Sequence, residues 1–308
     1  MLNYFQMSKS SKIKPQISVV IGVYNQVNVI EKVLKSFEEQ TIGTHSFEVI
    51  LVDSESTDGT TKLIQNLDTS YVLRVIVQKN QGKGAARNTG VREAKSDLIL
   101  ITDADMIADK QLLQTHVNAH KESKEPSTFQ GKTFNLKTLE WPTEEKNLYT
   151  YIKNPPRNKK KIGWWYFLTG NLSLPKHIFE SEGGFSKELN GYGYEDLELG
   201  YRFNKKRIPL RFLSNAINYH YHIVEKDEKL KIKEKAGKSG RQFIKLHPEL
   251  KLFIGINPIS VFLFKQIKKR GKLYTYIEKK LYKSKNQFKH KLGFYILKEF
   301  FYLKGLLS

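Results

Sequence analysis

Two aspartates that follow a short apolar stretch have the residue type and spacing of a metal site. Residues 98–101 (Leu-Ile-Leu-Ile) predict a strand buried on both faces, and Asp103 and Asp105 come just after it. Residues two apart in an extended chain point to one side, so these carboxylates offer hard oxygen ligands for Mg²⁺ or Mn²⁺. Open α/β sheets bind ligands at this carboxyl edge. A pair of solvated turn aspartates gives the same pattern, so the rest of the chain must decide.

The elements that would position these aspartates alternate between strand and helix. Four apolar stretches predict strands, at residues 17–23, 47–53, 71–77 and 98–101. Helical patterns separate them, the first running from residue 30 to about residue 40. Strands separated by helices indicate βαβ units, so we expect an α/β fold with a mostly parallel sheet and a nucleotide site at its carboxyl edge.

Composition narrows the class of protein. The chain has 308 residues, 39% of them hydrophobic, and can bury a real core. It has no cysteine, which excludes disulfides, thiolate zinc sites and cysteine nucleophiles. Its N-terminus lacks an apolar stretch of signal-peptide length, and no uncharged run reaches the length of a membrane span. We therefore expect a cytoplasmic protein.

The positive charge is concentrated near the C-terminus. The net charge is +21, and residues 225–308 hold 22 Lys and Arg against 7 Asp and Glu. Aromatic residues lie among these lysines, a pattern typical of basic amphipathic helices that bind an anionic membrane surface, here the inner face of the cell membrane. A helical subdomain packed on the rest of the chain or on a second subunit of an oligomer fits the pattern equally well.

Polar residues follow the predicted strands at the edge where a nucleotide would bind. An acid after the second strand can accept hydrogen bonds from a ribose hydroxyl or a base N–H group. Residues 80–90 add two glycines that let the backbone approach a phosphate, with cations to balance its charge. The predicted donor-binding residues are Val23, Tyr24, Asn25, Asp53, Gly82, Lys83, Arg87, Asp103, Ala104 and Asp105.

Four successive motifs resemble those of family 2 glycosyltransferases with the GT-A fold, including chondroitin-polymerase-like and galactosyltransferase-like members. They are the segments at residues 17–25, 52–59, 82–90 and 102–105. The resemblance implies a Rossmann-like, mostly parallel sheet and an inverting transferase that binds a nucleotide-sugar, commonly a UDP-sugar, through Mn²⁺ or Mg²⁺. It also implies that Asp53 contacts the base, Arg87 the ribose–phosphate region, and Asp105 the metal.

A second cluster of acids, Glu195 and Asp196, lies among glycines in residues 191–200. Such acids can cap a helix N-terminus, or one of them can take the proton of an acceptor hydroxyl. The stretch resembles the Glu-Asp motif of the same family. By that match Asp196 is the catalytic base and Glu195 a secondary contact to the acceptor.

Residues 163–173 are predicted to contact the acceptor. Trp164 and Trp165 can stack on a sugar ring or fill a core, and adjacent residues on a strand face opposite ways, so at most one would line the site. Residues 169–171 resemble the acceptor-side loop of the family, with Gly170 close to the acceptor and Asn171 as a hydrogen-bond donor.

Two histidines complete the predicted metal site. His220 and His222 are two residues apart on a predicted strand and would share one face. Many metal-dependent GT-A enzymes supply one histidine from this region. We choose His220 as the ligand beside Asp105, with His222 as the alternative.

These features lead to one predicted function and two alternatives. We expect single-displacement transfer of a sugar from a UDP-sugar to a hydroxyl of a glycan or lipid-linked acceptor in surface polysaccharide synthesis. The alternatives are a sugar-nucleotide nucleotidyltransferase and a basic nucleic-acid-binding protein, although no nucleic-acid motif accompanies the charge. The expected divisions are an N-terminal extension (1–15), nucleotide-binding (16–120) and acceptor-binding (121–225) halves, and a basic helical extension (226–308).

Overall fold

The computed structural model describes residues 3–6, 14–136, 138–139, 148–150, 156–222 and 226–308. The chain forms two compact units. The first comprises residues 1–187 and 195–223, and the second comprises residues 188–194 and 224–308. The predicted nucleotide-binding (16–120) and acceptor-binding (121–225) halves thus fall within one unit, except for residues 188–194 and 224–225.

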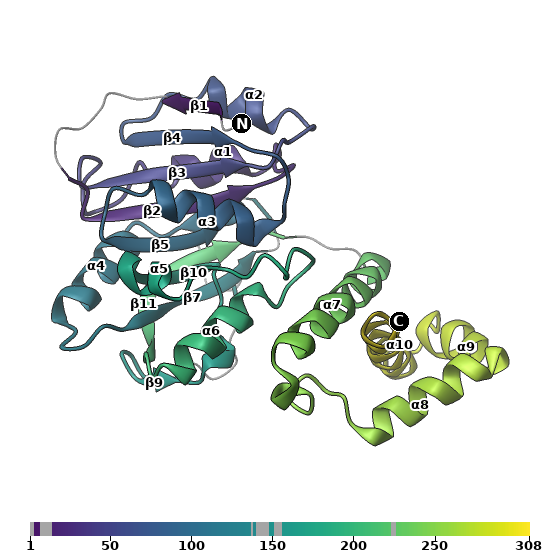
Figure 1. Ribbon diagram of the computed structural model, residues 1–308. Helices are drawn as coiled ribbons and strands as arrows, with labels where there is room; N and C mark the ends of the chain where they lie inside the picture. The colour runs from purple at the N-terminus through teal and green to yellow at the C-terminus, as the bar shows by residue number, and fades with distance from the viewer. Residues whose placement is uncertain (1–2, 7–13, 137, 140–147, 151–155, 223–225) are drawn as a thin grey trace. The chain divides into compact units, whose positions relative to one another are not determined.

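One mixed sheet runs through the first unit (Figure 1). Its strands follow the order β1 (Asn3–Gln6), β4 (Val72–Val77), β3 (Phe47–Asp53), β2 (Ile17–Val23), β5 (Leu98–Asp103), β10 (Asn171–Pro175), β7 (Thr128–Leu136), β11 (Leu210–His220) and β6 (Met106–Ala108). Two short strands, β8 (Leu148–Thr150) and β9 (Lys161–Ile162), pair with β7 and β11. The four strands from β4 to β5 are parallel. β10 then runs antiparallel to both of its neighbours, and β11 lies parallel to β7.

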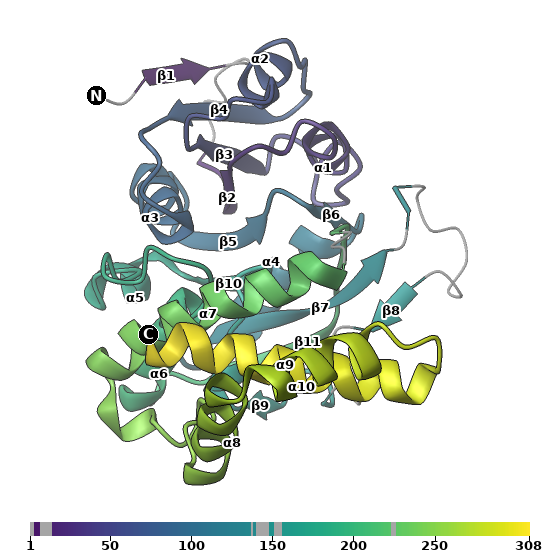
Figure 2. The same ribbon diagram turned by 90° about the vertical axis from the view of Figure 1, so that its right-hand side faces the viewer.

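Helices cover both faces of this sheet (Figures 1 and 2). Alternate residues of β2 show the division, because Val19 and Ile21 belong to one core and Val20 to the other. The first core is closed by α1 (Ile30–Lys35), α2 (Thr60–Gln65) and α4 (Leu112–Glu122). The second is closed by α3 (Lys83–Glu93), α5 (Lys176–Ser181) and α6 (Glu195–Lys205). Burial on both faces explains why these strands are continuous apolar stretches.

Three local differences separate the structure from the sequence predictions. Strand β1, inside the predicted N-terminal extension, extends the sheet by pairing antiparallel with β4. The first helix ends at Lys35 and not near residue 40, because the Ser36 hydroxyl donates to the Val33 carbonyl and accepts from the Ala108 N–H group. The two tryptophans lie on a short 3-10 helix, Trp164–Tyr166, and not on a strand.

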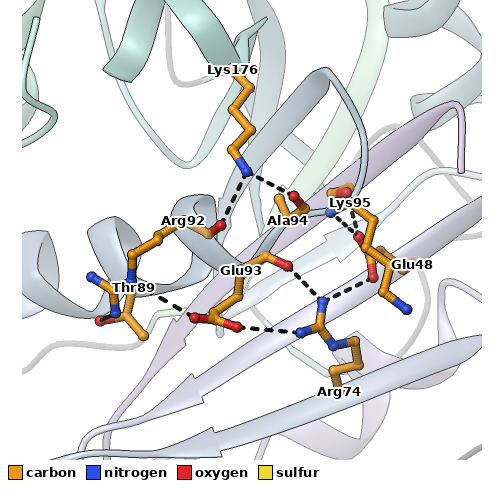
Figure 3. A network of polar contacts seen from close by, with 9 residues as sticks. Glu48, Arg74, Thr89, Arg92, Glu93, Ala94, Lys95 and Lys176 are labelled. Atoms are coloured by element: carbon orange, nitrogen blue, oxygen red, sulfur yellow. Dashed lines mark hydrogen bonds and ion pairs between the residues drawn. The ribbon is translucent and has the colours of Figure 1, made fainter. Parts of the chain in front are cut away.

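A buried ion-pair network links the parallel strands to α3 (Figure 3). The Glu48 carboxylate on β3 accepts from the Ser18 hydroxyl at 2.7 Å and from the Lys95 N–H group at 2.7 Å, and its second oxygen lies 3.3 Å from Arg74 Nη1. Arg74 also donates to the Glu93 carbonyl at 2.6 Å. The buried Glu48 charge is therefore both paired and hydrogen-bonded, as a charge inside a protein must be.

Two histidines of α4 lie in a polar cluster against β10. The His116 ring contacts Ser173 Oγ at 2.7 Å and Asn171 Oδ1 at 2.9 Å, and His120 Nε2 lies 2.8 Å from the same hydroxyl. Burial lowers the pKa of His116 to about 4. Burial, with the neighbouring His116, lowers the pKa of His120 to about 3. Both rings are therefore neutral in the folded protein near pH 7.

We expect these two histidines to make the first unit acid-sensitive. Because the folded-state pKa lies below the unfolded value of about 6.5, their stabilising contribution is complete above that pH and is lost as the pH falls toward 4. Each histidine should lower the free energy of unfolding by about 1.4 kcal/mol per pH unit over this range. Urea unfolding at several pH values measures the slope. The double variant His116→Asn/His120→Gln should flatten it, whereas the exposed-site control His45→Gln should not. Equal slopes in wild type and the double variant would refute this account.

The second unit is helical. It contains α7 (Lys226–Leu246), a 3-10 turn (Pro248–Leu250), α8 (Pro258–Lys269), α9 (Gly271–Tyr276), a π-helical turn (Ile277–Tyr282) and α10 (Gln287–Leu307). Helices α7 and α10 pack at backbone contact, because a Cβ on Gly237 would lie 2.1 Å from the Tyr302 carbonyl oxygen and one on Gly305 would lie 2.0 Å from that of Glu234. The unit has its own apolar core, which includes Leu230, Ile267, Ile277, Tyr282 and Leu297.

Candidate functional site

The carboxyl ends of the parallel strands bring the predicted donor-binding residues to one edge of the sheet. Val23 pairs with Asp53 across β2 and β3, and Gly22 pairs with Asp103 across β2 and β5. The two acids therefore end neighbouring strands on either side of β2. Polar groups at such an edge are available to a ligand that lies across the strand ends.

Two residues after β2 have different roles. Tyr24 is 48% exposed and offers an aromatic face at the edge. Asn25 adopts φ +53°, its side-chain oxygen accepts from the Thr57 N–H group at 2.8 Å, and its own N–H group donates to Ser56 Oγ at 2.9 Å. Asn25 thus ties the loop after β2 to the loop after β3.

Asp53 is enclosed. One carboxylate oxygen accepts from the backbone N–H and hydroxyl of Ser56, and the other accepts from the Thr61 hydroxyl, with no part of the residue exposed. In this conformation the carboxylate organises the loop that leads into α2. The predicted contact with a base stays a prediction, and because Asp53 is fully buried it requires the surrounding loop to open.

Two members of the predicted donor-binding set lie in the core. The Val23 side chain is 2% exposed and that of Ala104 is 4% exposed, and both pack among the apolar residues of the first core. Ala104 lies in the turn between β5 and β6, between Asp103 and the buried Asp105. Any contact of these two residues with a donor would therefore be through the backbone, and the prediction for them stays a prediction.

The glycine-rich entry to α3 brings two cations to the same edge. Gly82 adopts φ +89°, a backbone conformation that favours glycine, and Gly84 lies so close to Phe185 that a Cβ would come within 3.1 Å of it. Lys83 follows as an exposed side chain, and the nearby Asp103 raises the pKa of its ammonium group. Lys83 is therefore the cation of this loop that a phosphate can reach.

Arg87 is buried, and its predicted contact with the ribose–phosphate region of the donor stays a prediction. It is 2% exposed, with Nη2 2.6 Å from Asp103 Oδ1 and Nη1 3.1 Å from Glu195 Oε1. Burial acts to raise the pKa of Asp103, but Lys83 and Arg87 hold it well below its usual range. The guanidinium thus joins α3, β5 and α6, and it positions the acids on both sides.

The Glu-Asp pair begins α6. Burial and the adjacent Asp196 raise the pKa of Glu195, and its second oxygen is buried without a hydrogen-bond partner. Asp196 is half-buried, and its Oδ2 accepts from the Thr169 N–H group at 3.2 Å and from the Thr169 hydroxyl at 3.0 Å. Glu195 is 5% exposed and tied to Arg87, whereas the half-buried Asp196 carboxylate is the one of the two that an acceptor hydroxyl can reach.

The second aspartate of the Asp-x-Asp motif meets both predicted histidines. Asp105 Oδ2 lies 3.4 Å from His220 Nε2 and 3.6 Å from His222 Nδ1. One potential ligand atom from each residue lies within 4.8 Å of the others. Asp105 Oδ1 is buried and has no hydrogen-bond partner. A buried carboxylate oxygen without a partner, next to two imidazoles, fits a divalent cation such as Mn²⁺ or Mg²⁺.

Asn135 orients one of these histidines. Its side-chain oxygen lies 2.9 Å from His220 Nδ1, which leaves Nε2 free to face Asp105. Parallel pairing of β7 with β11 sets Asn135 beside His220. No sequence signal singles out Asn135, because the two residues are 85 positions apart.

The predicted acceptor loop reaches the donor acids through Thr169 and Gly170. A Cβ on Gly170 would lie 2.6 Å from Met106 Cε, the end of a flexible side chain, and 3.7 Å from Asp103 Oδ2, so the backbone of this loop passes close to the first aspartate of the motif. Thr169, which holds Asp196, was not among the predicted site residues. A threonine before Gly-Asn gives no signal of its own, since its role depends on a partner 27 residues away.

Asn171 has a structural role in place of the predicted acceptor contact. Its side chain is fully buried, with Nδ2 donating to the Ala216 carbonyl at 2.9 Å and the Lys132 carbonyl at 3.2 Å, and Oδ1 facing His116. Both N–H groups and the oxygen of its side-chain amide are therefore paired with residues of the first unit. The prediction is therefore corrected for this residue.

One residue of the tryptophan pair is buried and the other is exposed. Trp164 is buried against Tyr201, with ring centroids 5.1 Å apart, whereas Trp165 is 48% exposed. The tight 3-10 turn after Gly163, and not the alternation of a strand, separates the two rings. Trp165 is the one of the pair that a sugar can reach.

Comparison with known families agrees with this geometry. Residues 18–180, more than half of the chain, match the model described as glycosyl transferase family 2. Residues 152–226 match the model described as the N-terminal domain of galactosyltransferase. The two matches together include every acid and histidine of the site described above.

Two named relatives are 28% and 24% identical to this chain over the aligned residues. The validoxylamine A glucosyltransferase of Streptomyces hygroscopicus subsp. jinggangensis is 28% identical over 223 residues, which cover 64% of this chain and 53% of the relative. The chondroitin synthase of Pasteurella multocida is 24% identical, over 77% of this chain and 28% of the synthase. The chain thus spans about half the length, or less, of these two relatives.

Solved structures show the same fold. The mannosyltransferase PcManGT from Pyrobaculum calidifontis, in complex with GDP-Man and Mn²⁺, superposes with a TM-score of 0.60 at 15% identity, over 98% of this chain and 88% of that protein. S. aureus TarS in complex with UDP-GlcNAc gives a TM-score of 0.56 at 14% identity, over 80% and 77%. The predicted GT-A fold is confirmed.

Proposed function

The chain belongs to glycosyl transferase family 2, and from this premise we propose that it is a metal-dependent inverting glycosyltransferase that uses a UDP-sugar. The proposal rests on the meeting of Asp105, His220 and His222, with one Asp105 oxygen facing the histidines and the other buried without a partner. The same sheet edge holds Lys83 and Tyr24. A nucleoside diphosphate needs cations for its phosphates and an aromatic face for its base, and this edge offers both.

The metal would be held by Asp105 and His220, with His222 as a further ligand. A bound divalent ion supplies Lewis-acid stabilisation of the charge that develops on the leaving diphosphate. The chain's own contribution at this point is Lys83, an exposed ammonium group held in its charged form by Asp103. Asn135 keeps the His220 ring in the orientation that presents Nε2.

Asp196 is the proposed catalytic base. It accepts the proton of an acceptor hydroxyl as that oxygen forms a bond to the anomeric carbon, while the bond from that carbon to the diphosphate oxygen breaks. A single displacement of this kind inverts the anomeric centre. Thr169 fixes the Asp196 carboxylate, and Arg87 fixes Glu195 beside it, so the acids are oriented before the substrates bind.

The acceptor that we propose is a growing surface glycan or a lipid-linked oligosaccharide. The similarity to a chondroitin synthase, and to the hyaluronan synthase of Pasteurella multocida at 24% identity, supports a sugar hydroxyl as the acceptor. The exposed Trp165 ring supplies a surface on which a sugar can stack. Glu195 would donate or accept a second hydrogen bond to the acceptor.

Release of nucleotide from a donor panel tests the proposal. The purified protein is incubated with UDP-glucose, UDP-galactose, UDP-N-acetylglucosamine and GDP-mannose, each with Mn²⁺ and with EDTA, and free nucleotide is measured. We expect slow Mn²⁺-dependent release of UDP from at least one donor. Release from GDP-mannose alone would contradict the choice of UDP, and release that persists in EDTA would contradict the metal dependence.

A further inference from the structure

Helix α8 of the second unit carries apolar side chains on a solvent-facing side. Ile259 is 72% exposed, Phe262 is 59% exposed and Leu263 is 52% exposed. Their spacing of three and four residues places them on one face of the helix. Folded proteins rarely leave large neighbouring apolar side chains in water without a partner for them.

The other side of α8 is already occupied. Phe264 and Ile267 are buried, and the Phe264 ring lies 5.2 Å from the ring of Phe300 on α10. The residues that hold α8 in the second unit are therefore distinct from those that it exposes. The exposed face is not needed for the packing of this unit, and its apolar character requires another explanation.

Basic residues border the exposed face. Lys265, Lys269 and Arg270 are exposed and lie near the C-terminal end of the helix, and by helical geometry they flank the apolar residues. The turn before α8 continues the pattern with exposed Lys251, followed by Leu252 at 74% exposure. Apolar side chains bordered by Lys and Arg match the interface of a bilayer with anionic headgroups.

We propose that the α8 face, comprising Leu252, Ile259, Phe262, Leu263 and the adjoining Lys and Arg residues, binds the surface of an anionic phospholipid bilayer. The helix lies in the plane of the interface, with the apolar side chains among the upper acyl chains and the cations at the phosphates. Among the described residues, no helix combines the length and apolar character needed to cross a bilayer. The proposal does not depend on the transferase reaction.

Charge favours a membrane over a second copy of the chain as the occupant. Residues 225–308 carry a balance of +15, so two such surfaces brought face to face would repel each other. An anionic headgroup layer attracts the same surface, and each basic residue close to it adds to the attraction. The apolar and the charged parts of the face thus point to the same occupant.

Vesicle co-sedimentation of the full chain tests the proposal. The probes are vesicles of phosphatidylcholine alone and of phosphatidylcholine with one third phosphatidylglycerol, at low and high salt. We expect binding to the anionic vesicles that weakens as salt is raised. The variant Phe262→Ser/Leu263→Ser should lower the partition coefficient by about tenfold or more, since burial of each side chain contributes on that scale.

Matched variants show whether reduced vesicle binding comes from the loss of apolar side chains or from loss of folding. Phe262→Trp keeps a large apolar side chain at the same exposed position and should retain binding. Lys269→Glu/Arg270→Glu should weaken binding to anionic vesicles, whereas Lys269→Arg/Arg270→Lys should not. Failure of the wild-type chain to bind anionic vesicles, or equal binding by Phe262→Ser/Leu263→Ser, would overturn the proposal. A third outcome would also overturn the proposal. If the wild-type chain does not bind vesicles but self-associates, and the double variant does not self-associate, the face binds a second copy of the chain.

Discussion

Replacement of Asp196 by Asn should abolish sugar transfer and leave donor binding intact. The amide is nearly the same size, and its oxygen can still accept from Thr169, but it cannot take the proton of an acceptor hydroxyl. Removal of a general base lowers rates by about 10²–10⁴-fold. We therefore expect kcat to fall by this amount while the Kd for UDP stays within about twofold, as measured by nucleotide release with acceptor present and by calorimetry.

Glu195→Gln is the matched control for this variant, because it changes the neighbouring acid. Glu195 is buried and paired with Arg87, so an acceptor hydroxyl reaches it less readily than it reaches Asp196. We expect a smaller loss of kcat than in Asp196→Asn. Full transfer by Asp196→Asn together with loss in Glu195→Gln would show that the roles of the two acids are reversed.

Replacement of Arg87 by Met should cause the largest loss of stability in the first unit. The guanidinium is buried between Asp103 and Glu195, at 2.6 and 3.1 Å, and its removal takes from both carboxyl groups the cation that donates hydrogen bonds to them. Breaking a buried ion pair from one side costs about 3–5 kcal/mol. Urea unfolding followed by tryptophan fluorescence should show a decrease of this order in the free energy of unfolding.

Arg92→Met on the same helix is the control. Its side chain is 61% exposed and lies 3.7 Å from Glu93, and exposed pairs of this kind contribute at most about 1 kcal/mol. Arg87→Lys keeps the positive charge but cannot donate to both acids from one planar group. The free energy of unfolding of this variant should therefore lie between those of Arg87→Met and wild type. Equal stability of Arg87→Met and Arg92→Met would contradict a positioning role for Arg87.

The sequence was most informative where a local pattern decides the structure. Strands β2 and β3 have the predicted bounds, because continuous apolar stretches between polar loops belong to buried parallel strands. The Asp-x-Asp motif and the two histidines could be selected because their residue types are those of metal ligands. The structure adds that β11 ends at His220 and that His222, just beyond it, still faces Asp105.

Contacts between distant segments could not be predicted. Arg87 and Glu195 are 108 residues apart, and no periodicity indicates that they pair. Asn171 follows the acceptor loop in sequence, but the pairing of β10 with β5 and β7 buries it in the sheet. Asn135 and Thr169 act only through partners that the fold supplies. In each case the side chain's role depends on tertiary packing, and its neighbours in sequence give no signal for it.

Calorimetric titration with UDP and with GDP, each in Mn²⁺ and in EDTA, tests the central claim most directly. The account predicts that UDP binds in Mn²⁺ and not in EDTA, that GDP binds more weakly, and that Asp105→Ala and His220→Ala lose the metal-dependent binding. The exposed-site control Asp68→Ala should bind as wild type does. Binding of UDP that is unchanged by EDTA and by Asp105→Ala would contradict the metal-dependent site.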